Sequence, residues 1–351
     1  MRVLLVSAIP PPEGGIATWT TKYLEYCKFN NIEIDFVNIA LQGSRGKQIN
    51  TRRSIFDEIR RTHYIISKVK EYINNGKIDV VHINSSCSKF GIIRDFLCIK
   101  VAKKKKLPVV LHCHCNIEDQ IVHRYGVKLL KSMANMSLMV LVLNQKSYNF
   151  VENLTNTTVR IVPNFIEKDC VSDSHEIREQ IKEIVFVGHV QITKGCAEII
   201  EAACKLPDIH FTLVGPVNDE IKKLIIPSNV EMAGAVPSTS VGQFLAKADL
   251  YLFPSYTEGF SLSLTEAMAN GLPCIATDVG ANKDMLEEKG GIVIEKMSSD
   301  AIIEAIGNLT SYKDRLLASE WNIQKVKNTY LRENVMNQII SLYKMVMRNV
   351  V

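Results

Sequence analysis

Short apolar runs alternate with longer amphipathic segments along the whole chain, and this alternation limits the fold more than any other feature. In the first half the apolar runs are residues 3–7, 33–37, 79–83, 108–112, 138–143 and 159–162. Patterns of helical spacing, such as residues 52–74 and 126–135, separate them. The runs are continuously apolar, which is typical of parallel strands buried on both faces. Strands that alternate with helices predict an α/β chain with a doubly wound sheet.

The alternation then stops and begins again. A polar stretch, residues 167–182, follows the first series and is interpreted as a linker. The second series of apolar runs comprises residues 184–188, 209–214, 230–233, 250–253, 273–276 and 291–294. We therefore predict two doubly wound domains, residues 1–166 and 183–329, with a C-terminal helix at about 330–351 that packs back on the first. Ligands of such sheets bind beyond the carboxyl ends of the strands, so a cleft between the domains is the expected site.

Neither a membrane span nor a disulfide framework is expected. No apolar run approaches the ~20 residues that cross a bilayer, and the first run, Val3 to Ile9, ends at three prolines. A buried first strand therefore fits better than a signal peptide. The nine cysteines are an odd number in a long chain and are expected to stay reduced. These features predict a cytoplasmic protein.

Charge is distributed unevenly. Residues 1–170 carry 25 Lys and Arg against 14 Asp and Glu, and the remainder carries 17 against 23. Lys103 to Lys106 form the densest basic run. One interpretation is a solvated helix end, and another is attraction to the anionic inner face of a membrane. Nucleic acid is not expected as a partner, because no aromatic side chains interleave with the run to stack on bases.

The stretch from Phe253 to Pro273 carries the clearest chemistry. A predicted strand ends at Phe253, a loop carries Glu258, and a helix is expected from near Phe260 to Asn270, which places Glu266 about two turns inside it. Residues eight apart on a helix lie on similar faces, so both carboxylates can point to one side. Carboxylates bind sugar hydroxyls through strong hydrogen bonds, and a helix N-terminus attracts phosphate. The alternative from spacing alone is an acidic residue that stabilises the helix start, with Glu266 on a solvated face.

The wider motif resembles the signature of glycosyltransferase family 4, also called glycosyl transferases group 1. That signature is Glu-Gly-Phe-Gly, a second Glu eight positions after the first, then Glu-Ala-Met-Ala and Gly-x-Pro. Here Glu258-Gly259-Phe260-Ser261 is followed by Glu266-Ala-Met-Ala and Gly-Leu-Pro273, with Ser261 in place of the last glycine of the first element. The resemblance implies a GT-B fold, in which two Rossmann-like domains face each other across a cleft.

Three places in the first half are similar to the same family. Gly14 and Gly15 follow the first strand and permit close backbone approach at a helix N-terminus. His114 stands where the family has a histidine near the donor sugar, although Cys115 replaces the usual glycine after it. A structural histidine and a metal site at residues 112–115 are the alternatives, but adjacent strand residues point to opposite faces and cannot all reach one ion. Pro163-Asn164 resembles the family's element at the domain junction.

The second domain opens with Gly188-His189 and, a few residues on, Lys194-Gly195. The family usually has Gly-Arg, then Lys-Gly, whose cations hold the donor diphosphate. His189 in place of arginine is a departure, because histidine is charged only part of the time near pH 7. The alternative is that Lys194 acts alone and His189 is a spectator.

The resemblance implies a retaining hexosyl- or N-acetylhexosaminyl-transferase that needs no metal or other cofactor. Its donor would be a UDP- or GDP-sugar, and its acceptor a glycan or lipid-linked molecule of cell-surface polysaccharide or glycolipid synthesis. The implied catalytic residues are His114, Glu258 and Lys194. The implied donor-binding residues are Gly15, Gly188, His189, Lys194, Glu258, Gly259, Phe260, Ser261 and Glu266. Residues 40–53 and 115–125 are expected to shape the acceptor site.

Two other functions stay open at this point. One is a nucleotide-sugar-binding protein without catalysis, and the other is a nucleotide-sugar epimerase of the same fold. A dehydrogenase that uses NAD is disfavoured, because the first strand–turn–helix lacks the Gly-x-Gly-x-x-Gly spacing of a dinucleotide site.

Overall fold

The computed structural model describes residues 1–11, 14–40 and 55–348. Its contacts divide the chain into two units, and each is described by itself. The first comprises Met1–Pro163 with Met336–Val351, and the second Asn164–Val335. Among the described residues, no helix combines the length and the apolar character that crossing a bilayer requires.

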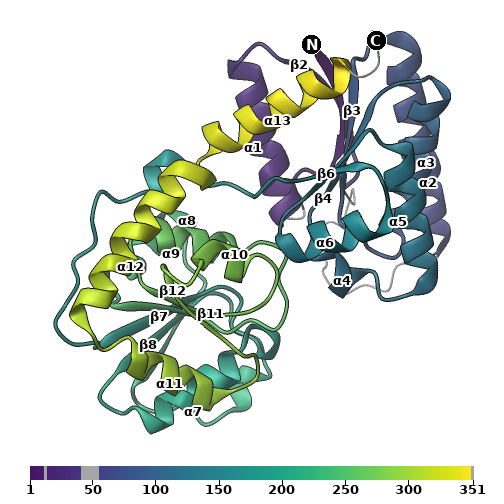
Figure 1. The fold of residues 1–351 in the computed structure, drawn as a ribbon. Coiled ribbons are helices and arrows are strands. Elements are labelled where there is room, and N and C mark those ends of the chain that lie inside the picture. Colours follow the sequence, from purple (N-terminus) through teal and green to yellow (C-terminus); the bar gives the residue numbers. More distant parts are fainter. Residues whose placement is uncertain (12–13, 41–54, 349–351) are drawn as a thin grey trace. The chain divides into compact units, whose positions relative to one another are not determined.

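The first unit is built around a six-stranded parallel sheet in the order β2-β1-β3-β4-β5-β6 (Figure 1). The strands are β1 (Arg2–Ser7), β2 (Glu33–Asn38), β3 (Val80–Ser85), β4 (Val109–Cys113), β5 (Met139–Val142) and β6 (Thr158–Ile161). Every residue of β3, β4 and β5 is buried. The continuous apolar runs therefore form strands covered on both faces, as the sequence predicts.

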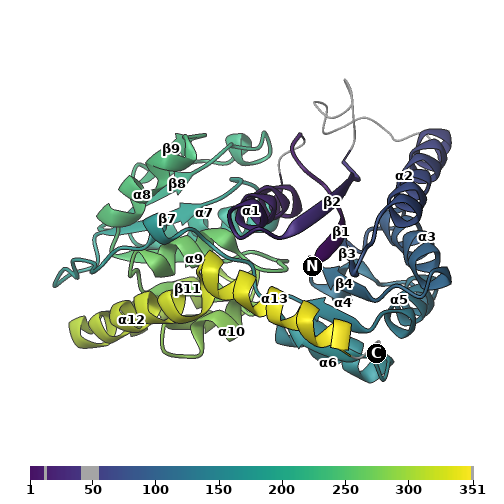
Figure 2. The ribbon, with the colours of Figure 1, turned by 90° about the horizontal axis from the view of Figure 1, so that it is seen from above.

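Helices cover both faces of this sheet. They are α1 (Gly15–Phe29), α2 (Ile55–Asn75), α3 (Gly91–Lys104), α4 (Ile117–Gln120), α5 (Arg124–Met136) and α6 (Gln145–Leu154). Figures 1 and 2 show α2, α3 and α5 side by side on one face. On the other face α1 packs with the last helix, α13 (Arg332–Arg348), through Tyr23 and Tyr343, whose hydroxyls are 2.9 Å apart.

The second unit has a six-stranded parallel sheet in the order β12-β11-β10-β7-β8-β9. Its strands are β7 (Glu183–Val187), β8 (His210–Val214), β9 (Val230–Gly234), β10 (Leu250–Phe253), β11 (Cys274–Thr277) and β12 (Gly291–Ile294). Its helices are α7 (Cys196–Lys205), α8 (Ser238–Lys247), α9 (Leu262–Ala269), α10 (Asn282–Leu286), α11 (Ser299–Asn308) and α12 (Tyr312–Lys325). In Figure 1, α7 and α11 lie on one face of the sheet, and α9 and α12 on the other.

Two segments differ in detail from the sequence interpretation. Residues 167–182, interpreted from the sequence as a linker, belong to the second unit and pack against its other elements: Ser172 N–H donates to Ala269 O at 3.0 Å and the Arg178 guanidinium pairs with Asp249 at 3.3 Å. The helical pattern over 311–347 is interrupted, because a π-helix at Val326–Tyr330 ends in an extended residue, Leu331. That residue bridges to Ile166, and Arg332 N–H donates to Ile166 O.

Each sheet has one point at which the strand order reverses. In the first sheet β1 lies between β2 and β3, and in the second β7 lies between β8 and β10. Loops that leave such a pair of strands diverge to opposite faces, so a crevice opens beyond their carboxyl ends, where ligands of doubly wound sheets bind. The expected ligand positions are therefore at the loops after β7 and β10 and at those after β1 and β3.

Candidate functional site

The loops after β7 and β10 bring two predicted site residues together. Lys194 closes a short 3-10 helix, Ile192–Lys194, after β7, and Glu258 lies in the loop after β10. The Lys194 ammonium forms an ion pair with Glu258 Oε1. Ser255 Oγ donates to the same carboxylate oxygen at 3.0 Å. The side chains of Lys194 and Glu258 are 24% and 13% exposed, so the pair is accessible to a ligand but shielded from bulk water.

Gly195 explains why Lys194 reaches Glu258. Its φ is +74°, a left-handed conformation that glycine adopts without strain. A Cβ at this position would lie 2.2 Å from the backbone oxygen of Pro254. The first turn of α7 can therefore approach the end of β10 this closely only with glycine at this position.

Gly280 constrains the same loop from the other side. It follows β11 with φ +52°, and a Cβ there would lie 2.3 Å from Glu258 O and 2.8 Å from Gly259 O. The backbone that carries Glu258 thus rests directly on Gly280. Two glycines distant in the sequence hold this loop between β7 and β11.

Helix α9 begins later than the sequence predicts. It spans Leu262–Ala269, and Ser261 is its N-cap, with its hydroxyl accepting from Leu264 N–H at 3.1 Å. The prediction of a start near Phe260 was wrong, because a serine at this position caps the helix. Glu266 is consequently about one turn inside the helix and not two. Phe260 is buried against Tyr330, with ring centroids 5.5 Å apart.

Glu258 and Glu266 lie around one buried phenol. The Tyr251 hydroxyl donates to Ser263 Oγ at 2.8 Å. Burial raises the pKa of Tyr251 well above its usual value, and the neighbouring carboxylates of Glu266 and Glu258 add to the rise. Burial also raises the pKa of Glu266. Both carboxylates are therefore near enough to the Tyr251 hydroxyl to act on it electrostatically.

Gly188 and His189 follow β7 directly. Gly188 N–H donates to Val214 O at 2.9 Å, and its φ is +153°. A Cβ on Gly215 would lie only 1.9 Å from Gly188 O, so the two turns after β7 and β8 are in backbone contact. The His189 side chain is exposed at this edge. Its replacement of arginine therefore leaves the packing of the second unit unaffected.

In the first unit, Gly15 opens α1 with Gly14 as N-cap. A Cβ on either glycine would meet nothing within 4 Å. Neither residue is required by the packing of the first unit, which leaves open the interpretation that their backbone approaches a ligand. Of residues 40–53, which are predicted to shape the acceptor site, residues 41–53 lie outside the described part of the chain.

His114 lies just beyond the end of β4. Its backbone N–H donates to Ser85 O at 2.8 Å, and its half-buried ring is 3.9 Å from that of His112 and 5.0 Å from that of Trp19. His112 and His82 stack at 5.4 Å deeper in the sheet. Burial lowers the pKa of His82 to about 3 and that of His112 well below its usual value, so both are neutral.

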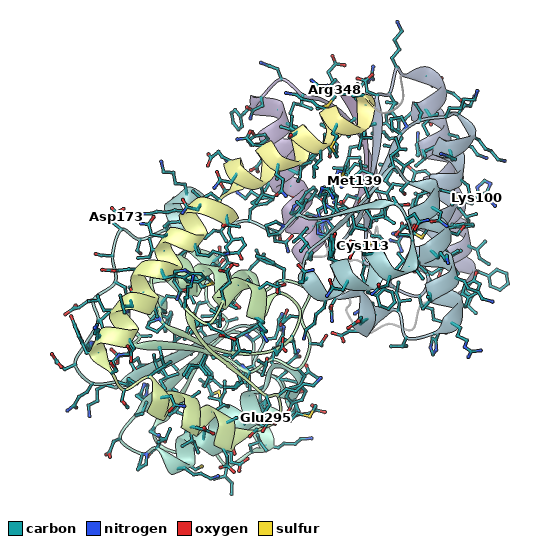
Figure 3. The ribbon with its side chains drawn as sticks, in the orientation of Figure 1. Lys100, Cys113, Met139, Asp173, Glu295 and Arg348 are labelled. Carbon is teal, nitrogen blue, oxygen red and sulfur yellow. The ribbon has the colours of Figure 1, made fainter. Side chains whose placement is uncertain are left out.

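The neighbours of residues 112–115 alternate between the two faces of the sheet. The imidazoles of His112 and His114 lie with Trp19, whereas the thiols of Cys113 (labelled in Figure 3) and Cys115 lie at Cys87. The alternation expected of a strand therefore separates the two histidines from the two cysteines. In the described ranges, no group of three or more His, Cys, Asp or Glu residues is placed to hold a metal ion.

Comparison with known proteins identifies the family to which the second unit is similar. Residues 167–324, nearly the whole second unit, match the family model of glycosyl transferases group 1. The second unit is a group 1 glycosyl transferase domain. The predicted resemblance is confirmed by this match, and the Lys194–Glu258 pair lies inside it.

One relative and two solved structures are similar to the chain. The chain is 27% identical to the putative teichuronic acid biosynthesis glycosyltransferase TuaC of Bacillus subtilis, over 59% of this chain and 56% of the relative. Sucrose-phosphate synthase of Thermosynechococcus elongatus superposes with a TM-score of 0.78 at 15% identity, covering 99% of each chain. Anabaena HepE in complex with UDP-glucose superposes with a TM-score of 0.73 at 13% identity, covering 98% of this chain and 100% of the other. The chain has the GT-B fold, as predicted.

Several residues that build this site have no counterpart in the sequence prediction. Ser255 bonds the Glu258 carboxylate within the loop after β10, Gly280 supports the backbone of that loop from beyond β11, and Tyr251 bonds Ser263 in α9. Gly195 was visible in the sequence as part of the Lys-Gly pair. The contact that makes it necessary, with Pro254, depends on β7 and β10 being neighbours.

Proposed function

We propose that this group 1 glycosyltransferase transfers a sugar with retention from a UDP- or GDP-sugar to a glycan or lipid-linked acceptor in cell-surface polysaccharide or glycolipid synthesis. The observation that carries the proposal is the Lys194–Glu258 ion pair at the strand-order reversal of the second unit. A doubly wound sheet binds nucleotides at this position. HepE, whose fold is similar, is seen in complex with UDP-glucose.

Each donor group has a complementary residue in this proposal. The diphosphate lies at the Lys194 ammonium and the N–H groups of Gly259 and Phe260, which precede α9. The ribose hydroxyls donate to the Glu266 carboxylate, and Glu258 accepts hydroxyls of the transferred sugar. Gly188 allows close approach of the backbone, and His189 supplies a second cation when protonated.

The Lys194–Glu258 pair then rearranges when the donor binds. Transfer breaks the bond between the anomeric carbon and the diphosphate oxygen, the acceptor hydroxyl oxygen forms the new bond to that carbon, and its proton passes to the leaving diphosphate. Negative charge develops on the leaving diphosphate, where Lys194 stabilises it. Of the first unit, Gly15 and His114 remain predicted contacts of the donor and the reacting sugar.

The nucleotide can be identified by thermal shift with a panel of UDP-, GDP- and ADP-sugars. We expect a rise in melting temperature with one nucleotide and loss of that rise in Lys194→Ala. Retention is then tested by NMR of the anomeric proton of the product. Donor binding without turnover on any acceptor would favour a non-catalytic binding protein, and conversion of the donor without an acceptor would favour an epimerase.

The proposed lipid-linked acceptor places the chain at an anionic membrane surface. Helices α2 and α3 enclose a groove of about 420 Å³ whose lining includes Lys70, Lys100, Lys104 and Lys105 beside apolar side chains. The last two belong to the basic run noted in the sequence. Lysines near an anionic surface contribute about 1 kcal/mol each.

Vesicle sedimentation tests this part of the proposal. Replacing Lys104 and Lys105 by glutamine should weaken binding to phosphatidylglycerol vesicles about thirtyfold, from ~2 kcal/mol. The matched control replaces Lys222 and Lys223 of the second unit by glutamine. It likewise removes two charges, and it should leave vesicle binding unchanged. Equal binding of both variants, or no binding of the wild type at low salt, would argue for a soluble acceptor.

A further inference from the structure

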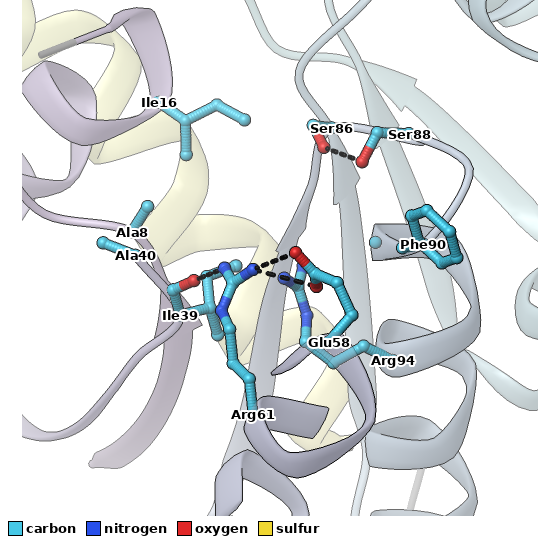
Figure 4. Close-up of a pocket in the computed structure, with 11 residues that line it drawn as sticks. Ala8, Ile16, Ile39, Ala40, Glu58, Arg61, Ser86, Ser88, Phe90 and Arg94 are labelled. Atoms are coloured by element: carbon cyan, nitrogen blue, oxygen red, sulfur yellow. Dashed lines mark hydrogen bonds and ion pairs between the residues drawn. The ribbon is translucent and has the colours of Figure 1, made fainter. Parts of the chain in front are cut away.

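A second polar pocket lies wholly within the first unit. It has a volume of about 300 Å³ and opens at the ends of β1, β2 and β3 (Figure 4). Its lining includes Glu58, Arg61, Ser86, Ser88, Gly91 and Arg94. This is the strand-order reversal of the first sheet, the position that corresponds to the Lys194–Glu258 site of the second. The volume is at the small end of ligand pockets and suits one monosaccharide unit with an attached group.

The pocket carries two guanidinium groups and one carboxylate. Arg94 is 7% exposed, and its Nε and Nη2 both donate to Asp95 Oδ1, at 2.9 and 2.7 Å. Arg61 reaches from α2, where its Nη1 pairs with Glu58 at 3.2 Å and its Nη2 donates to Ile39 O. The ion pairs hold both arginines in place, and Figure 4 shows their side chains extending toward the same space. Each arginine thus has a carboxylate partner, and only one of the two carboxylates, Glu58, lines the pocket.

Gly91 marks the polar end of the pocket. A Cβ at this position would lie 2.6 Å from Ser88 Oγ, 3.4 Å from Ser86 Oγ and 3.6 Å from Arg94 Nη2. Two hydroxyls and a guanidinium thus converge on a space that exists only because residue 91 lacks a side chain. Ser86 Oγ donates to Ser88 Oγ at 3.1 Å, which positions both hydroxyls.

The start of helix α3 adds to this end of the pocket. The helix begins at Gly91, its N-cap Phe90 makes no side-chain cap, and its first turn holds no acidic residue. Ile92 N–H already donates to Ser88 O at 2.9 Å, so the helix contributes chiefly the positive end of its dipole, which favours an anion at Gly91. Hydroxyls, a planar guanidinium and a helix N-terminus together form a donor set that matches the oxygens of a phosphate ester.

We infer that this pocket binds a phosphate ester of the acceptor, so that the acceptor is a phosphorylated sugar or a lipid-linked sugar phosphate. The inference rests on the proposed function, which supplies the acceptor. The phosphate lies at Gly91, Ser86, Ser88 and Arg94, and Arg61 binds it from α2. Glu58 accepts a hydroxyl of the sugar that carries the phosphate.

Calorimetry of the full-length chain with inorganic pyrophosphate, in the presence of saturating UDP or GDP, tests the pocket separately from the donor site. Arg61→Gln and Gly91→Ala should each weaken pyrophosphate binding at least tenfold, the first by removing a charged donor and the second by filling the space at the serines. Arg60→Gln removes the same charge from the exposed side of α2 and should leave binding unchanged. Circular dichroism shows whether each variant is folded.

Two outcomes overturn the inference: no pyrophosphate binding by the wild type, or equal affinity in Arg61→Gln, Gly91→Ala and Arg60→Gln. Nucleotide-sugar binding, measured by thermal shift, should be the same in all of these variants. If the wild type bound no nucleotide-sugar but still bound pyrophosphate, the proposed function would be refuted and the pocket would not. Glucose 1-phosphate and vesicles with a polyprenyl diphosphate then distinguish the source. If the chain binds glucose 1-phosphate and this binding depends on Arg61, the acceptor is soluble. If only the vesicles are bound in a way that depends on Arg61, the acceptor is lipid-linked.

Discussion

Substitution of Gly280 by alanine perturbs the loop that carries Glu258 without touching a proposed ligand contact. The new Cβ would lie 2.3 Å from Glu258 O, whereas ordinary contacts begin at 3.4 Å. The loop must therefore move by about 1 Å, because both partners are backbone atoms. The φ of +52° adds a cost of about 1–2 kcal/mol for a residue with a Cβ.

We expect the free energy of unfolding of Gly280→Ala to fall by about 2–3 kcal/mol, from the left-handed conformation together with the contact. We also expect the transfer rate to fall about 100-fold, since a misplacement of 1 Å has effects of this size. Urea unfolding gives the first quantity. Initial rates of transfer, measured at a temperature at which the variant is folded, give the second.

Gly242→Ala is the matched control. Gly242 lies in α8, and a Cβ there would meet nothing within 4 Å. This variant should be as stable as the wild type or more so by about 0.5–1 kcal/mol, with unchanged transfer. If Gly280→Ala kept the stability and the rate of the wild type, the argument that Gly280 positions Glu258 would be refuted.

Four further predictions concern three side chains. Glu266→Ala should abolish transfer and remain folded. The control Glu304→Ala, on an exposed helix face, should change neither the transfer rate nor the fold. Wild-type turnover in Glu266→Ala would remove Glu266 from the mechanism. Because burial raises the pKa of Glu266, the wild type should lose stability as pH rises above 4.5, and Glu266→Gln should lose less; equal slopes in urea unfolding would contradict this. Lys194→Ala should lower kcat about 10²–10³-fold, whereas Lys205→Ala at the exposed end of α7 should leave it unchanged; equal rates of the two would exclude Lys194 as the group that stabilises the leaving diphosphate. Burial lowers the pKa of His82 from 6.5 to about 3, so the stability that the neutral histidine contributes above pH 6.5 is lost as pH falls toward 3. In His82→Gln the free energy of unfolding should fall less steeply over this range. An equally steep fall would show that this histidine is not buried in its neutral form.

Local patterns predicted a large part of this structure. The apolar runs correspond to the strands, because parallel strands buried on both faces need continuous apolar residues. The motif from Glu258 to Pro273 predicted a loop followed by a helix and located both carboxylates. Its error, the start of α9, arose because Ser261 is the N-cap.

The contacts between loops could not be predicted in this way. Lys194 and Glu258 are 64 residues apart, and they meet only because β7 and β10 are neighbours. The pocket at Arg61 and Arg94 likewise depends on β1 lying between β2 and β3. Strand order arises from the packing of whole elements, and no local pattern around these residues encodes it.

The most direct test of the account is a crystal structure of the chain with the nucleotide that thermal shift identifies. The account predicts that the Lys194 ammonium leaves Glu258 for the diphosphate, and that the ribose hydroxyls bind the Glu266 carboxylate. A nucleotide bound elsewhere, with the Lys194–Glu258 ion pair unchanged, would contradict it.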